Sequence, residues 1–76
     1  MENFYFENTQ GIHNKFWAID IIRRKETGNY ILTRRWGKIG EAGRSKSEVF
    51  YELWDADNKR DNLIREKKRK GYEPIL

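Results

Sequence analysis

The sequence has no cysteine and only one histidine and one proline. Without cysteine the chain can form no disulfide, no thiolate metal site and no thiol nucleophile. The absence also fits a reducing compartment. The lone His13 lacks the partner ligands of a zinc site and has no nucleophile motif beside it, so we interpret it as a solvated loop histidine. We therefore expect no catalytic residue, no metal and no cofactor.

Long apolar runs are also absent. No stretch approaches the roughly 18 residues that a membrane span requires, and the N-terminal region lacks the apolar run of about 7–15 residues typical of a signal peptide. These features predict a soluble, intracellular and cytoplasmic protein, located in the nucleoid or the nucleus if it is bound to DNA. A length of 76 residues fits one small domain, so we expect a single domain over residues 1–76.

Charged residues and aromatic rings, by contrast, are abundant. Charged residues make up 37% of the chain, a proportion that on its own favours disorder. The chain also holds three tryptophans, four tyrosines and four phenylalanines. Because each buried ring removes about 150–250 Å² from water, we expect a folded domain with a small aromatic core.

The first half of the chain alternates in the manner of strands. We predict strands at residues 3–7, 16–22, 30–36 and 44–50, with the second and third joined by a turn in which Gly28 takes a positive φ. Along 16–22, Trp17, Ile19 and Ile21 share one face, whereas Phe16 and neighbouring alternate residues lie on the other. This pattern predicts a half-buried strand with Trp17 in the core.

From about Glu52 the apolar residues recur with a helical period. One face is expected to carry Leu53, Ala56, Leu63, Ile64 and the stem of Lys67. Arg60 lies on or beside this face, so we expect its stem to cover the core and its guanidinium to reach water.

Signals for the two ends of this helix differ in strength. Gly71 is a good terminating residue. The start is weak because no capping side chain lies just ahead of Glu52, although Asp55 could cap a later start. Residues 72–76 form a final extended piece. The expected fold class is α+β: a small twisted antiparallel sheet of about four strands with one long C-terminal helix packed across a face.

The net charge of +4 is unevenly distributed. Lys and Arg dominate residues 23–46 and again 59–70, and an acidic stretch at 47–57 separates them. Basic blocks of this kind favour a polyanion partner, because neutralised phosphates release condensed counterions. The alternative is that they only solvate the surface. For 59–70 alone we favour that alternative.

The segment 34–46 combines lysine and arginine residues with a tryptophan and three glycines. It lacks the phosphate-loop pattern and the dinucleotide fingerprint, which argues against nucleotide hydrolysis and dinucleotide binding. An indole at a loop edge can stack on a nucleobase or a sugar for about 1–3 kcal/mol. The neighbouring lysine and arginine side chains can hold phosphates. The candidate nucleic-acid-binding residues are Arg35, Trp36, Gly37, Lys38, Arg44 and Lys46.

Trp36 has a second interpretation as a core residue that shares a strand face with Leu32. Composition alone favours that interpretation, since tryptophan is usually largely buried. For Trp54, beside Leu53, the pattern does not indicate a direction.

Several landmarks occur in order along nearly the whole chain. They are Asn14, Lys15, Phe16, Trp17 and Ile19; Arg35, Trp36, Gly37, Lys38, Ile39, Gly40 and Gly43; Ser45, Lys46, Ser47 and Phe50; and Ala56, Leu63, Ile64, Glu66, Lys67, Lys70, Gly71 and Tyr72. In these residues the chain resembles the WGR domain, named for its Trp-Gly-Arg tripeptide. Lys38 stands where the family has the signature arginine, which keeps the charge but loses the planar fork. Two further positions depart from the family. Arg60 stands where the family tends to have a small apolar residue, and Glu52 stands where it tends to have a Ser-type helix cap.

The resemblance implies a binding module without chemistry of its own. In poly(ADP-ribose) polymerases the domain lies beside the catalytic domain and helps to sense DNA breaks. By position, Trp36 would meet the terminal sugar at a DNA end, Lys38 would replace the signature arginine, and Lys46 would contact phosphate. A chain of 76 residues has no room for a transferase domain, so we expect no enzyme and no small-molecule substrate. The alternative is a protein–protein module that docks an acidic partner or a sister domain.

Overall fold

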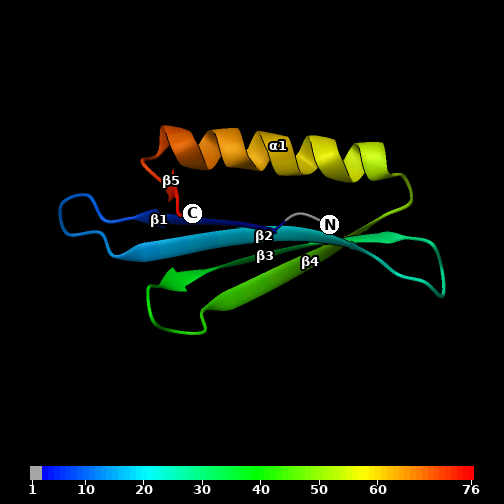
Figure 1. Ribbon diagram of the computed structural model, residues 1–76, viewed down its shortest axis with the longest axis horizontal. Coiled ribbons are helices and arrows are strands. Elements are labelled where there is room, and N and C mark those ends of the chain that lie inside the picture. Colours follow the sequence, from blue (N-terminus) through cyan, green and yellow to red (C-terminus); the bar gives the residue numbers. More distant parts are fainter. Residues whose placement is uncertain (1–2) are drawn as a thin grey trace.

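The computed structural model describes residues 3–76 and shows a five-stranded sheet with one helix lying across one face (Figure 1). The elements are β1 (Asn3–Asn8), β2 (Lys15–Arg23), β3 (Tyr30–Lys38), β4 (Arg44–Phe50), α1 (Leu53–Arg69) and β5 (Glu73–Pro74). The strands pair in the order β4-β3-β2-β1-β5, and every neighbouring pair is antiparallel. The α+β class predicted from the sequence is confirmed.

Each of the four predicted strands is present, and the C-terminal extended piece forms a fifth. β2 and β3 make the expected hairpin, and Gly28 in its turn has a φ of 74°. β5 pairs with β1 through Phe6 opposite Pro74 and Glu7 opposite Glu73. The pairing returns the C-terminus to the first strand, so local strand signals alone could not reveal it.

The core lies between the sheet and α1. The register places Trp17 between Phe6 and Trp36, and Ile21 opposite Leu32, all on the face towards the helix. The fully buried members are Phe6, Trp17, Ile19, Ile21, Leu32 and Ala56. Burying each large side chain contributes about 1.5–3 kcal/mol, and the predicted core position of Trp17 is confirmed.

Helix α1 begins without a side-chain cap. Glu52 has extended backbone angles and no capping hydrogen bond, which confirms the weak start, whereas Asp55 lies inside the first turn. The expectation that Leu53 faces the core is wrong, since 38% of it is exposed. The residues of the first turn are exposed, and burial begins at Ala56. No helix within residues 3–76 is long and apolar enough to cross a membrane.

The C-terminal end of α1 follows the sequence prediction. Gly71 has a φ of 100°, and the Tyr72 N–H donates to the Lys67 carbonyl at 3.1 Å, so the chain turns back just after the helix. Glycine at this position tolerates the left-handed backbone that closes a helix.

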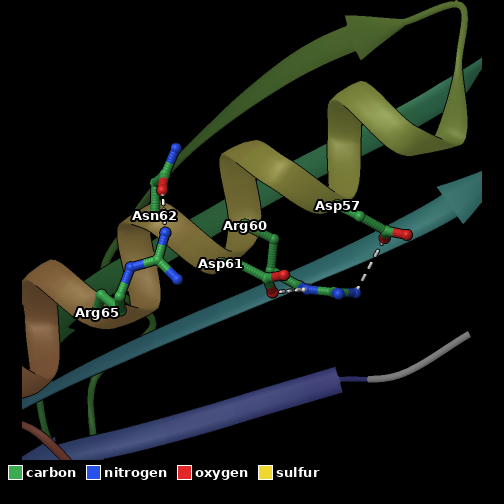
Figure 2. Close-up of polar contacts among 5 residues, drawn as sticks. All are labelled: Asp57, Arg60, Asp61, Asn62 and Arg65. Carbon is green, nitrogen blue, oxygen red and sulfur yellow. Dashed lines mark hydrogen bonds and ion pairs between the residues drawn. The ribbon is translucent and has the colours of Figure 1, made fainter.

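Arg60 lies on the side of α1 towards β1. Its guanidinium carbon is 5.5 Å from the centre of the Phe4 ring. Nη1 lies 3.2 Å from Asp57, and Nε donates to Asp61 at 3.1 Å (Figure 2). Arg60 therefore covers apolar surface, but with its guanidinium over Phe4. That group meets two carboxylates of its own helix instead of extending freely into water, and its side chain is only 16% exposed.

The opposite face of the sheet has its own small buried cluster. Phe16 points away from α1 but is only 2% exposed. The Tyr5 ring stacks on it at 5.9 Å, and the guanidinium of Arg35 lies 5.4 Å from its centre. Alternation predicted the direction of Phe16, but its complete burial comes from neighbours on β1 and β3.

Candidate functional site

Trp36 lies on β3 directly opposite Trp17 of β2 and Arg44 of β4. It shares the helix-facing side of the sheet with Leu32, yet 37% of it is exposed and it lies outside the buried core. Its indole borders a hollow of about 250 Å³ between β3 and α1. Trp36 therefore rests against the core and keeps a surface that a partner can reach.

Two glycines hold the turn that follows Trp36. Gly43 has a φ of 76°, and a side chain there would overlap the Trp36 carbonyl oxygen and come within 2.9 Å of the Phe16 ring. A side chain on Gly37 would approach Gly43 Cα to 2.8 Å. The absence of side chains at both positions lets the backbone close tightly. The turn therefore fixes the backbone of Trp36 over the Phe16 cluster.

The structure brings the side chains of four of the six predicted site residues to one face. Strand alternation and the register place Trp36, Lys38, Arg44 and Lys46 on the side that carries α1. Lys38, Arg44 and Lys46 are exposed. The guanidinium of Arg35 instead lies over Phe16 on the other face, and Gly37, which has no side chain, lies near the end of β3 opposite Phe16.

A second group of cations, which sequence reasoning did not select, adjoins Trp36. Arg34 and Lys67 line the same hollow as the indole. Lys67 also lines a neighbouring hollow of about 270 Å³, whose other lining residues are Asn8, His13, Lys15, Lys70 and Tyr72. Residues 59–70 therefore contribute part of their charge to a concave surface beside Trp36. The loop residue His13 is exposed at its border, as predicted.

Two sequence signals could have found these cations. Arg34 is two residues before Trp36, so strand alternation alone puts it on the same face. Lys67 and Lys70 are three residues apart, which places them on adjacent turns of one helix face. The position of Lys15 depends on the pairing register, which sets it directly opposite Lys38.

Positive charge is concentrated around Lys67. Its Nζ lies 5.8 Å from the Trp17 ring and 5.3 Å from the Tyr72 ring. Burial lowers the pKa of Lys67, and the nearby charge of Lys70 lowers it further. Glu66 acts in the opposite direction. The site thus disfavours an ammonium ion at Lys67, so an anion bound here would relieve an existing electrostatic cost.

Arg34 is also incompletely satisfied. Its Nη2 lies 3.4 Å from Glu48, but its Nε is buried and has no hydrogen-bond partner within residues 3–76. An unpaired buried donor costs free energy. The hollow beside Trp36 is therefore lined by two cations, Arg34 and Lys67, and one carboxylate, Glu66. The two cations are suited to phosphate or carboxylate oxygens.

The chemistry of the site is that of binding. It offers an indole surface, ammonium and guanidinium groups and a closely approachable glycine turn. Among residues 3–76 no group of three or more His, Cys, Asp or Glu side chains is placed to hold a metal ion. Such an arrangement can hold a polyanion and stack on a planar or sugar ring.

Comparisons with known proteins agree with this architecture. The chain is 33% identical over 67 residues to the human protein mono-ADP-ribosyltransferase PARP3, covering 86% of this chain and 12% of that protein. It is 31% identical over 48 residues to poly [ADP-ribose] polymerase 2 of Arabidopsis thaliana, covering 63% of this chain and 8% of the relative. The chain thus spans about a tenth of the length of these relatives.

A solved structure from Bacteroides fragilis superimposes with a TM-score of 0.83 at 28% identity, covering 99% of this chain and 20% of that one. The sequence model of the WGR domain matches residues 2–76. The match spans the strands, the Trp36 turn and the helix that build the site, and the chain therefore belongs to the WGR domain family.

Proposed function

We propose that this WGR domain is a non-catalytic nucleic-acid-binding module that contacts DNA ends or strand breaks. The observation that carries the proposal is the accessible indole of Trp36 beside a hollow lined by Arg34 and Lys67. Nucleic-acid binding is the role of the WGR domain in poly(ADP-ribose) polymerases, and one of the two relatives is named as such an enzyme, which supports the assignment.

Each part of the surface has a distinct role in this proposal. The indole packs on the terminal sugar or base, which is available only where the duplex stops. Lys38, Arg44 and Lys46 meet phosphates of one strand. Lys38 attracts phosphate as a point charge, without the two-pronged geometry of the arginine that is usual in the family.

The cations of the second hollow, Lys15, Lys67 and Lys70, extend the contact to a longer stretch of the DNA backbone. Lys67 and Lys70 lie on the helix, and Lys15 lies on β2, so a phosphate in their hollow is approached from two elements. Arg35 supports the site indirectly by covering Phe16 under the turn. Because phosphate contacts dominate, binding should be largely independent of sequence, with a dissociation constant of about 10⁻⁴–10⁻⁶ M at physiological salt.

The test compares linear and closed-circular DNA of the same sequence at two salt concentrations. We expect tighter binding to the linear form. Trp36→Ala should weaken this binding by about 5–150-fold, the equivalent of losing about 1–3 kcal/mol of stacking. The matched control is Trp54→Ala, which removes an indole that is 72% exposed on the first turn of α1. The control should bind linear DNA like the wild type.

The outcomes separate the proposal from its alternatives. Equal binding to both DNA forms, unchanged in Trp36→Ala, would leave a non-specific basic surface. If no nucleic acid binds at low salt but an acidic protein does, the domain is a protein–protein module that uses the same cations.

A further inference from the structure

The two borders of the sheet differ in how they are closed. One border is β5, which has only two residues and includes Pro74. A short edge strand with proline resists pairing with another chain. The other border is β4, which has seven residues and contains neither proline nor glycine. Within residues 3–76 its outer side has no strand partner, as Figure 1 shows.

The sequence of β4 is complementary to itself when it is read in the antiparallel direction. Centred on Ser47, such a pairing sets Lys46 opposite Glu48 of a second copy, and the two-fold symmetry repeats this contact. We propose that two copies of this chain associate through β4, which continues the antiparallel sheet across the interface. The proposal concerns self-association. It uses Arg44 and Lys46 of β4, which the proposed DNA contact also uses, so pairing and DNA binding should compete at these two residues.

The charges along β4 support a second copy as the occupant. In the register with β3, Lys46 stands directly opposite Arg34. Like charges in that position are unfavourable, and no carboxylate within residues 3–76 forms an ion pair with Lys46. Glu48 lies 3.4 Å from Arg34. In the pair, each Glu48 lies between its own Arg34 and Lys46 of the second copy.

The remaining positions also match. Ser47 meets Ser47 of the second copy, which extends the contact of 2.9 Å between its hydroxyl and that of Thr33. Arg44 falls opposite Phe50, a pairing of guanidinium and ring that is favourable when stacked. Val49, which is 53% exposed, lies opposite the small Ser45. No position brings two like charges together or two large side chains into conflict.

Sedimentation equilibrium without nucleic acid, at low salt and over a range of protein concentrations, tests the proposal. The wild type should pass from 9.3 kDa to twice that mass as its concentration rises. Lys46→Glu places two glutamates opposite each other, and Glu48→Lys places two lysines opposite each other. Each variant should remain monomeric at concentrations where the wild type is fully paired.

The decisive measurement is a mixture of the two single variants. A Lys46→Glu chain and a Glu48→Lys chain oppose glutamate with lysine at both contacts, so the mixture should form the dimer that neither variant forms alone. The double variant, with both charges exchanged, should also pair. The control Lys25→Glu makes the same charge change in an exposed loop and should pair like the wild type.

Net charge cannot mimic this result. Lys46→Glu lowers the net charge from +4 to +2, which by itself would favour association. Circular dichroism establishes that each variant is folded. A wild type that stays monomeric, single variants that pair normally, or a mixture that fails to pair would each overturn the proposal. These outcomes do not decide the comparison of linear and closed-circular DNA with Trp36→Ala, because Trp36 lies on β3, outside the strand that pairs.

Discussion

Trp17 and Trp36 lie directly opposite each other on neighbouring strands and point to the same side of the sheet, yet their environments differ. Trp17 is 2% exposed, between the Phe6 ring at 5.7 Å and the Lys67 side chain on α1. Trp36, one strand closer to the border, is 37% exposed. One residue type on one face is therefore part of the core in one case and partly accessible in the other, and the cover provided by β1 and α1 decides which.

The largest expected effect is the loss of Trp17. Trp17→Ala should lower the free energy of unfolding by about 3–5 kcal/mol, because it removes a fully buried ring and leaves a cavity. Trp36→Ala should cost only about 1 kcal/mol while it abolishes the preference for DNA ends. Urea unfolding followed by circular dichroism measures the loss of stability in each variant. Equal costs would mean that Trp36 serves the core as much as Trp17 does.

The contrast shows what the sequence can and cannot predict. Alternation assigned Trp17 to the core and gave the face of Trp36, because both follow from the period of a strand. It could not predict how far α1 covers that face, which depends on where the helix crosses. The fold was therefore largely predictable, whereas the accessible part of Trp36 was not.

Neighbours in sequence were a poor guide to neighbours in the site. Arg35 adjoins Trp36 in the chain but lies over Phe16 on the opposite face, while Arg34 lines the hollow of Trp36. Lys67 joins the same hollow from the helix, more than thirty residues away. Contacts of this kind depend on register and helix phase, which are set by long-range packing.

A second prediction concerns the turn, which holds Trp36 and not Trp17. Gly43→Ala combines a left-handed φ with overlap against the Trp36 carbonyl and the Phe16 ring. We expect it to destabilise the domain by about 1–3 kcal/mol and to weaken binding to DNA ends. Thermal unfolding and titration with linear DNA measure the two effects.

Gly40→Ala is the matched control for this prediction. Gly40 also has a left-handed φ, of 93°, but a side chain there meets nothing within 4 Å. Gly40→Ala should lower the free energy of unfolding by about 1 kcal/mol, the cost of the backbone strain alone. If the two variants behave alike, the close approach at Gly43 does not determine the position of Trp36.

The smallest expected effect is the pH dependence that arises at Lys67, whose ammonium lies over the Trp17 ring and borders the hollow of Trp36. Burial, followed by the charge of Lys70, lowers its pKa below the ordinary value of 10.5. The unfolded chain therefore holds this proton more tightly than the folded domain does. The resulting destabilisation is present in full below the folded pKa, and it fades as the pH rises through that value towards 10.5.

Lys67→Met keeps an apolar stem and removes the charge, so it isolates this contribution. The free energy of unfolding of the wild type, minus that of Lys67→Met, should rise as the pH increases through the lowered pKa of Lys67 towards 10.5. Titrating groups that are distant from Lys67 cancel in this difference. The change should be small because solvent screens a partly buried lysine. DNA that occupies the hollow should reverse the trend by favouring the ammonium, so that binding takes up protons at alkaline pH. A difference that is flat with pH, or one that falls, would show that the ammonium of Lys67 is not disfavoured beside the Trp17 and Tyr72 rings.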